Sequence, residues 1–199
     1  MPTAAPTGGS LGRGARARIL AAAQACFSRQ GMVATSVNDL RAQARVSKRT
    51  LYEHFASKDE LLIAYLGECG LSAAEAVLDR EQLTPRARLL ELFTTLGAAE
   101  HARPDPVLAA AIEFPDRTHP VHRAAADQAA RLLERLRGLA AAAGAADPDQ
   151  VARQLALIYA GAGARLLVDD AEVVIGDAHR LAASILRQAI DHSGTDQST

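Results

Sequence analysis

Residues 35–55 read TSVNDLRAQARVSKRTLYEHF, and this stretch predicts two short helices separated by a tight turn. Ser36 is followed three residues later by Asp39, which resembles a capping box with Asp in place of the usual Glu or Gln. The first helix is therefore predicted over residues 37–43. The turn that follows, residues 44–46, has about the three-residue length expected of a helix-turn-helix.

The second helix is predicted from its own N-terminal signals. Ser47 is an N-cap candidate, placed to accept a hydrogen bond from a backbone amide of the first turn. Val46 before this cap and Leu51 four positions after it have the spacing of a hydrophobic staple. Together these signals predict a helix over residues 48–55.

The polar face of this second helix indicates a possible function. Leu51 and Phe55 are four residues apart, so they share one face and can anchor the helix inward. The remaining positions carry mostly basic, polar and aromatic side chains, namely Lys48, Arg49, Thr50, Tyr52, Glu53 and His54. A short helix with a basic N-terminus suits the major groove of DNA. A solvated surface helix is the alternative interpretation of the same pattern.

The wider stretch of residues 27–62 resembles the N-terminal DNA-binding domain of the TetR (tetracycline-repressor) family. The matching residues are Phe27, Gly31, Thr35, Ser36, Val37, Asp39, Leu40, Val46, Ser47, Thr50, Leu51, Tyr52, His54, Phe55, Ser57 and Lys58. The resemblance implies a homodimeric transcriptional repressor that a small-molecule ligand releases from an inverted-repeat operator. We expect the second helix to face the groove of double-stranded DNA. The residues expected at the DNA backbone are Thr35, Ser36, Arg45, Ser47 and Lys58.

Two positions depart from the family pattern. Arg45 stands in the turn where the family usually has Gly, which tolerates positive φ, whereas Arg does so only at a cost. Arg45 therefore either bears strain or belongs to a non-glycine turn, and it adds a cation near any bound duplex. Arg41 stands where the family usually has Ala, and we expect it to face solvent.

Composition favours an all-α fold and a nucleic-acid partner. Hydrophobic residues make up 49% and aromatic residues 4% of the 199-residue chain, and alanine is abundant. Such a composition is globular and favours closely packed helices. Residues 1–60 carry nine Lys or Arg and four Asp or Glu, a net +5, and the remainder carries thirteen and nineteen, a net −6, which together give the stated −1. A basic N-terminal part on an acidic body is typical of a nucleic-acid reader with a separate second domain.

The sequence offers no support for catalysis, a cofactor or a membrane span. It contains no HExxH, Gly-rich phosphate loop or GxSxG pattern, so we expect neither an enzyme nor a metal site. His119 and His122 have a weak metal-like spacing, and solvated histidines in a helix-capping loop are the favoured interpretation. Cys26 and Cys69 are predicted to be free thiols in a reducing cytoplasm. No apolar run approaches the ~20 residues of a membrane helix, and no signal peptide is evident.

The remaining chain divides into predicted helices and connecting loops. About nine helices are expected, over residues 15–29, 37–43, 48–55, 57–80, 85–101, a short helix ending at 114, then 121–143, 148–168 and 178–191. The expected organisation is a disordered arm (1–13), a helix-turn-helix DNA-binding domain (14–58), a helical ligand-binding and dimerisation domain (59–192) and a disordered tail (193–199).

The last two predicted helices favour a homodimer. The helix over residues 148–168 is apolar nearly all round and must be covered on most sides. The last helix carries two apolar stripes, which a monomer of this size cannot easily bury together. The interface candidates are Ala156, Ala160, Gly163, Leu181, Ala182, Ile185, Leu186 and Ile190. A tight intramolecular core with some exposed apolar surface is the alternative.

The size of the second domain, together with the family resemblance, predicts a pocket for an unknown small apolar ligand. The candidates combine apolar walls with a few polar groups. They are Phe93, Leu96, Ile112, Glu113, Phe114, His122, Tyr159 and Leu166. Each residue taken singly could equally fill a core. A helical enzyme or small-molecule-binding protein without DNA function is the alternative for the whole chain.

Overall fold

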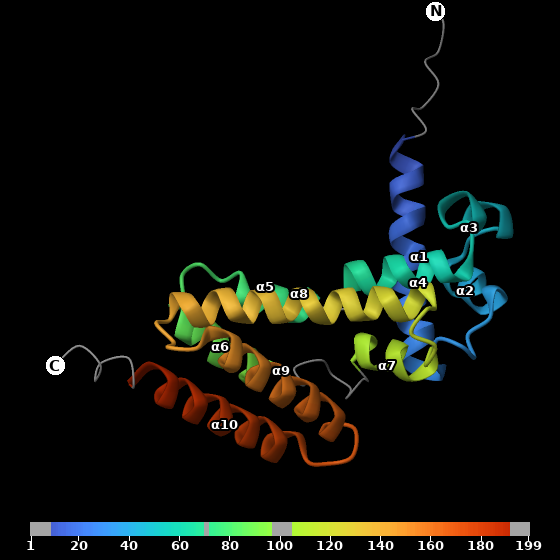
Figure 1. Ribbon diagram of the computed structural model, residues 1–199. Helices are drawn as coiled ribbons and strands as arrows, with labels where there is room; N and C mark the ends of the chain where they lie inside the picture. The colour runs from blue at the N-terminus through green and yellow to red at the C-terminus, as the bar shows by residue number, and fades with distance from the viewer. Residues whose placement is uncertain (1–8, 70–71, 97–104, 192–199) are drawn as a thin grey trace, which may run out of the picture.

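The computed structural model describes residues 9–69, 72–96 and 105–191, and these ranges contain helices but no strand. Ten helical segments lie in them: Gly9–Gln30 (α1), Val37–Ala44 (α2), Lys48–His54 (α3), Lys58–Cys69 (α4), Ser72–Leu78 (α5), Pro85–Thr94 (α6), Pro106–Glu113 (α7), Pro120–Ala142 (α8), Pro148–Arg165 (α9) and Ala171–Asp191 (α10). We call α1–α3 the head and α5–α10 the body. Figure 1 places the head at one end of the molecule and α6, α9 and α10 at the other, with α4 and α8 running between.

The predicted fold class is confirmed, and the two short helices of the head begin at the predicted residues. The first helix is longer than predicted, because α1 begins at Gly9 and not near residue 15. Residues 9–13 of the predicted disordered arm are therefore helical. Leu11, Arg13 and Ala15 are good helix formers, and they outweigh the glycines between them. The rest of the arm, residues 1–8, and the tail from residue 192 lie outside the described residues.

The last helix also begins earlier than predicted. The expected loop before residue 178 is wrong, because α10 starts at Ala171. Asp170 supplies the start signal, since its Oδ1 accepts hydrogen bonds from the amides of Glu172 at 3.0 Å and Val173 at 3.2 Å. Gly176, which suggested a loop, lies inside the helix, where a glycine costs about 1 kcal/mol and is tolerated.

Two other predicted helices are only partly described. Helix α6 ends at Thr94, short of the predicted residue 101, and residues 97–104 lie outside the described part of the chain. The predicted rod over 57–80 corresponds to α4 and α5, on either side of residues 70–71, which are not described. Ser57 caps α4 as predicted, because its Oγ accepts from the Glu60 amide at 3.0 Å.

One stretch of the chain is apolar enough to compare with a membrane helix. By length and composition alone, Lys58–Leu78 could cross a membrane, because it contains an 18-residue window with a mean hydropathy of 1.5. Half of this window is buried inside the protein, which also fits a helix of a folded core.

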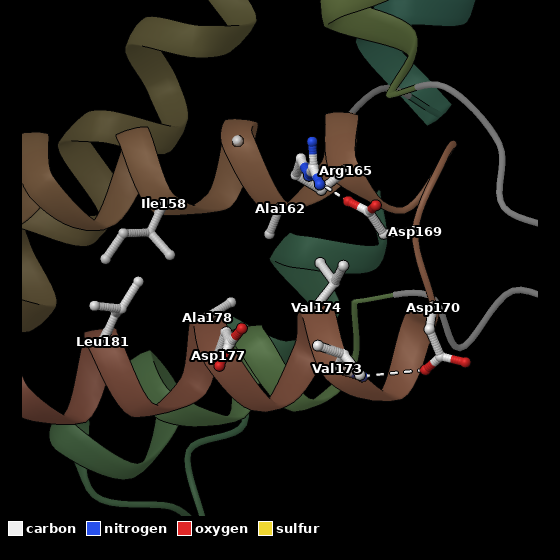
Figure 2. Close-up of a pocket in the computed structure, with 11 residues that line it drawn as sticks. Ile158, Ala162, Arg165, Asp169, Asp170, Val173, Val174, Asp177, Ala178 and Leu181 are labelled. Carbon is white, nitrogen blue, oxygen red and sulfur yellow. Dashed lines mark hydrogen bonds and ion pairs between the residues drawn. The ribbon is translucent and has the colours of Figure 1, made fainter.

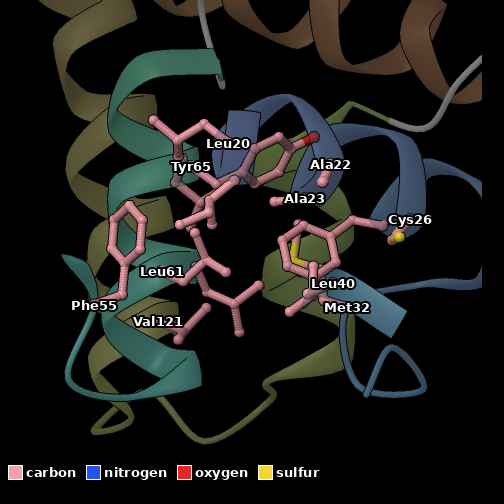
Figure 3. Packing of buried hydrophobic residues seen from close by; sticks show 14 of the residues in the cluster. Leu20, Ala22, Ala23, Cys26, Met32, Leu40, Phe55, Leu61, Tyr65 and Val121 are labelled. Atoms are coloured by element: carbon pink, nitrogen blue, oxygen red, sulfur yellow. The ribbon is translucent and has the colours of Figure 1, made fainter. Parts of the chain in front are cut away.

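The apolar core of the head continues into its neighbours. Buried residues of α1, α2 and α3 form one cluster with residues of α4, α7 and α8, and Figure 3 shows part of it. In this cluster Phe55 and Leu40 from the head lie with Leu61 of α4 and Val121 of α8. The Phe27 and Tyr65 rings meet edge to face with 5.2 Å between their centroids. The head is therefore packed directly onto the rest of the molecule.

A second apolar core holds the body together. Its buried residues come from α5, α6, α8, α9 and α10, and Phe93 and Leu186 are among those that are completely inaccessible. Helix α8 contributes to both clusters, through Val121 and Ala125 in the first and Leu132 and Leu136 in the second. It therefore connects the two cores along its length.

The turn between α2 and α3 is a non-glycine variant under backbone strain. Arg45 has φ 53° and ψ 48°, the left-handed region, and it is the only non-glycine residue with positive φ in the described ranges. Its amide donates to the Ala42 carbonyl at 3.2 Å and the Val46 amide donates to the Arg41 carbonyl at 3.1 Å. These hydrogen bonds form a Schellman-type helix end, a geometry that glycine adopts without a Cβ penalty.

The strain at this turn can be measured by substitution. Arg45→Gly is expected to raise the free energy of unfolding by up to about 1 kcal/mol, because it removes the left-handed penalty. Arg41→Gly is the matched control, since it also removes an exposed arginine but places glycine inside α2, and it should lower stability by about 0.5–1 kcal/mol. Equal losses in both variants, measured by denaturant unfolding, would contradict the strain argument.

Candidate nucleic-acid interface

Capping and burial fix the orientation of α3. The Ser47 Oγ accepts a hydrogen bond from the Thr50 amide at 2.9 Å and lies 2.8 Å from the Thr50 hydroxyl. Leu51 and Phe55 are 1% and 2% exposed, so they hold one face of α3 against the core. The opposite face must therefore point to solvent, as predicted.

That solvent face is basic and partly aromatic. Arg49 has an 88% exposed side chain, and its Nε donates to the Glu53 Oε1 at 2.8 Å across one helical turn. The hydrogen bond to Glu53 raises the pKa of Arg49. The Lys48 ammonium lies 5.9 Å from the centroid of the Tyr52 ring, within reach of a cation–π attraction. Arg45 is exposed in the preceding turn. These side chains form a surface that can donate hydrogen bonds to base edges and phosphates.

Several other DNA-binding candidates have internal partners. Thr35 is completely buried, and its hydroxyl donates to the Gly31 carbonyl at 2.6 Å, so it stabilises the end of α1. The Lys58 ammonium donates to the Val33 carbonyl at 3.0 Å, and burial lowers its pKa. Thr50 and His54 are half-buried. Thr35 and Lys58 therefore stabilise the segment between α1 and α2, and the exposed face of α3 is left to approach a partner.

The predicted capping box at the start of α2 is present in full. The Ser36 Oγ accepts from the Asp39 amide at 3.1 Å, and the Asp39 Oδ2 accepts from the Ser36 amide at 3.0 Å. The Ser36 hydroxyl donates to the same carboxylate at 2.7 Å. These hydrogen bonds, the side-chain one first, lower the pKa of Asp39. The first helix of the turn is therefore fixed by local contacts that the sequence already indicates.

The eight ligand-binding candidates lie in three different parts of the described structure. Phe93, Leu96 and Tyr159 belong to the body core, Ile112, Glu113, Phe114 and His122 lie where α7 approaches α8, and Leu166 follows α9. Glu113 is not a free polar handle, because its carboxylate accepts from the amides of Met32 at 2.9 Å and Val33 at 2.6 Å. The Nδ1 of His122 donates to the Phe114 carbonyl at 2.7 Å. Sequence spacing could not detect contacts between residues about 80 positions apart.

The loop histidine His119 also has a structural role. Its Nδ1 accepts from the Val121 amide at 3.2 Å and so caps α8. Its Nε2 lies 3.6 Å from the Asp59 carboxylate of α4, and its ring stacks on Phe114 with 4.8 Å between centroids. The helix-capping loop is present as predicted, but His119 and His122 are half-buried and not solvated.

The surface of α9 and α10 contains a hollow of about 570 Å³. Figure 2 shows Ile158 and Ala162 of α9 on one side and Val174, Ala178 and Leu181 of α10 on the other. Large apolar side chains stand exposed on these helices and the loop between them: Leu157, Leu167, Val168, Val173 and Leu181. Only Leu181 of these was predicted, because the others lie outside the predicted small-residue stripe or in the stretch read as a loop.

The dimer-interface candidates divide by burial. Ala182 and Leu186 are completely buried within the chain, so their side chains cannot meet a partner. Leu181 and Ala160 are exposed, and Ala156, Gly163, Ile185 and Ile190 are half-buried. Two apolar stripes were predicted on the last helix, and the packing of α10 on α6 and α9 decides which stripe is internal.

Comparisons with known proteins agree with this architecture. A family model described as bacterial regulatory proteins, tetR family, matches residues 19–65. The HTH-type transcriptional regulator YjdC of Escherichia coli is 31% identical over 118 residues, which span 58% of this chain and 61% of that protein. The chain thus spans less than two thirds of the length of this relative.

Solved structures extend the similarity over most of the chain. SCO4454, a TetR-family transcriptional regulator from Streptomyces coelicolor, is 28% identical with a TM-score of 0.79, and the match covers 89% of this chain and 96% of that one. A protein described as a tetR transcriptional regulator, sav143 from Streptomyces avermitilis, is 35% identical with a TM-score of 0.72. That match covers 89% of this chain and 98% of the other.

Proposed function

The chain belongs to the tetR family of bacterial regulatory proteins, and from this premise we propose that it is a homodimeric transcriptional repressor that reads operator DNA in the cytoplasm. The observation that carries the proposal is the exposed face of α3, which bears Lys48, Arg49 and Tyr52. An enzyme or a ligand-binding protein without DNA function would have no use for a basic, exposed recognition helix in a helix-turn-helix.

Charge and geometry support DNA as the partner. Residues 1–60 carry a net +5 on a chain whose total is −1, so attraction to phosphates is concentrated where α3 is exposed. Helix α3 has seven residues and stands on two buried anchors, which leaves its first turn free to enter a major groove. Glu53 pairs with Arg49, and this ion pair must open or shift when Arg49 contacts a base.

The face of α9 and α10 supports a second copy of the chain as the other partner. Val173 is 59% exposed and Leu181 is 56% exposed, and both line the hollow between these helices. Exposed apolar side chains that gather on one face indicate an interaction site, and here they lie beside charged residues that also line the hollow, Arg165, Asp169, Asp170 and Asp177. A two-fold axis would bring the same face of both protomers together and would present two heads to an inverted repeat.

Two polar groups support a small-molecule ligand: Tyr159, which packs against the body core, and Asp105, which caps α7. Burial, and secondarily the charge of Asp105, raises the pKa of Tyr159 to about 12. Burial also raises the pKa of Asp105, whose carboxylate accepts from the amides of Val107 at 2.8 Å and Leu108 at 3.0 Å. Ligand sites combine apolar walls with a few polar groups of this kind. We propose that a ligand bound here, beside Phe93 and Leu96, releases the DNA.

The role of α3 is tested by removing its most exposed cation. Arg49→Ala should weaken binding to a preferred duplex by about 1–3 kcal/mol and relax sequence preference at one position. Arg131→Ala removes an exposed arginine from α8 and is the matched control, which should bind as the wild type does. Unchanged affinity and sequence preference for Arg49→Ala in a salt titration would show that α3 does not enter the groove.

The dimer is tested with a charge on the exposed apolar face. Leu181→Glu should shift the protein to monomers in sedimentation equilibrium, because an isologous interface would contain the new carboxylate twice. Ile112→Glu is the matched control, since Ile112 is 68% exposed on α7, away from this face. The proposal would be wrong if Leu181→Glu formed dimers as strongly as the control.

The ligand proposal is tested with apolar compounds in a thermal-shift screen. A compound that stabilises the protein should bind Tyr159→Phe several-fold more weakly, about the effect of losing one hydrogen bond. Tyr52→Phe removes a hydroxyl from the head and should leave the ligand affinity unchanged.

Because coupling is reciprocal, operator duplex should weaken ligand binding by the same factor by which the ligand weakens DNA binding. Equal ligand affinity with and without duplex would exclude release by that compound.

A further inference from the structure

A single carboxylate of the body accepts two hydrogen bonds from the backbone of the head. Glu113 is the last residue of α7, and its two oxygens accept separate hydrogen bonds from the consecutive amides of Met32, at 2.9 Å, and Val33, at 2.6 Å. These amides follow the end of α1 and precede α2. Hydrogen bonds to an ionised carboxylate are stronger than those between neutral groups, and two of them fix direction as well as distance.

Gly31 and Lys58 lie beside these two hydrogen bonds and support the same turn. Gly31 has φ 86°, and a Cβ at this position would lie 3.2 Å from each carboxylate oxygen, so the absence of a side chain leaves room for Glu113. On the other side of the turn, the Lys58 ammonium donates to the Val33 carbonyl at 3.0 Å. The turn of residues 31–34 is thus held by an anion from the body and a cation from the start of α4.

The Glu113 hydrogen bonds lie where a movement of the body can be transmitted to the head. Helix α7 packs mainly on α8, whose far half belongs to the body core. The turn that Glu113 holds connects α1 to α2, and α2 leads directly to α3. A displacement of α7 relative to α8 would therefore act on the backbone of the head through these two hydrogen bonds.

We propose that Glu113 is a positioning residue whose carboxylate fixes the orientation of the head relative to the body, and through it the placement of α3 on DNA. The proposal rests on the DNA-reading function proposed above. Removal of these two hydrogen bonds should leave the head folded, because Leu40, Leu51 and Phe55 stay buried in the apolar cluster that α4, α7 and α8 complete. It should free the head to change its angle.

Glu113→Gln is the test variant, because glutamine has nearly the same shape but only one acceptor and no charge. Its amide group would place donors against a backbone donor. Hydrogen exchange at the amides of Met32 and Val33 should accelerate about tenfold or more, as expected for the loss of a charge-assisted hydrogen bond. The amides of α3 should keep wild-type protection. Glu134→Gln, which removes an exposed carboxylate from α8, should change neither.

Two further measurements separate positioning from local stability. The first uses donor and acceptor dyes at Ala42→Cys in α2 and Ala141→Cys in α8 of one protomer, mixed with excess unlabelled protein. Glu113→Gln should broaden the distance distribution.

The second measurement is of binding to inverted repeats with inserted base pairs. The variant should lose about tenfold affinity for the best spacing and discriminate less between spacings, while a single half-site binds equally well.

The outcomes distinguish this proposal from the function on which it rests. Wild-type exchange at Met32 and Val33 in the variant, or an unchanged dye distribution and spacing preference, would overturn the positioning role. A wild-type protein that binds no duplex specifically would instead overturn the DNA-reading function. The exchange and dye measurements need no DNA, so they would still decide whether Glu113 orients the head.

Gly31→Ala offers an independent approach from the other side of the contact. Gly144 has φ 85° with open space around its missing side chain, so Gly144→Ala carries the same backbone penalty without a clash. Gly31→Ala should accelerate exchange at Met32 and Val33 and broaden the dye distribution, whereas Gly144→Ala should do neither. Identical behaviour of both alanine variants would contradict a close approach of Glu113 to Gly31.

Discussion

The head cannot bury its apolar residues by itself, and the rest of the structure depends on this constraint. Helices α2 and α3 have eight and seven residues, well below the length of about 12 at which isolated helices become even marginally stable in water. Their buried anchors therefore need partners, and α4, α7 and α8 supply them within one continuous cluster. A recognition helix this short is ordered only because the head and the adjoining helices share a core.

A shared core also makes the head responsive to the body. Polar contacts surround the apolar junction: Glu113 holds the turn after α1, His119 approaches Asp59 at the start of α4, and Arg16 of α1 pairs with Glu68 farther along α4. The Arg16 guanidinium also lies 5.4 Å from the centroid of the Phe55 ring. Apolar packing supplies most of the stabilisation of this junction but has little directional preference. Hydrogen bonds to backbone amides, in contrast, specify the angle between head and body. In this account, the body influences DNA binding through that angle.

Local chemistry explains what the sequence predicted well. The caps at Ser36 and Ser47 act over three residues, so their spacing alone located α2 and α3, and the unusual Arg45 was recognisable from the turn it occupies. Long-range packing explains what the sequence could not provide. Periodicity identified two apolar stripes on α10 but not that Ala182 and Leu186 face inward. Thr35 and Glu113 were predicted to contact DNA and ligand, but in the folded chain they have internal partners. Gly176 suggested a loop because Asp170, which caps α10, was assigned to that loop as well.

The most direct test of the central claim is selection of binding sites from random duplex DNA by the full-length protein at physiological salt. The account predicts enrichment of an inverted repeat, because two heads related by a two-fold axis should read the same half-site in opposite directions. The enriched duplexes should bind at least about 10³-fold more tightly than unselected DNA, as is typical of specific sites. Failure to enrich any sequence, or enrichment of one asymmetric site without a repeat, would contradict a symmetric DNA reader built on α3.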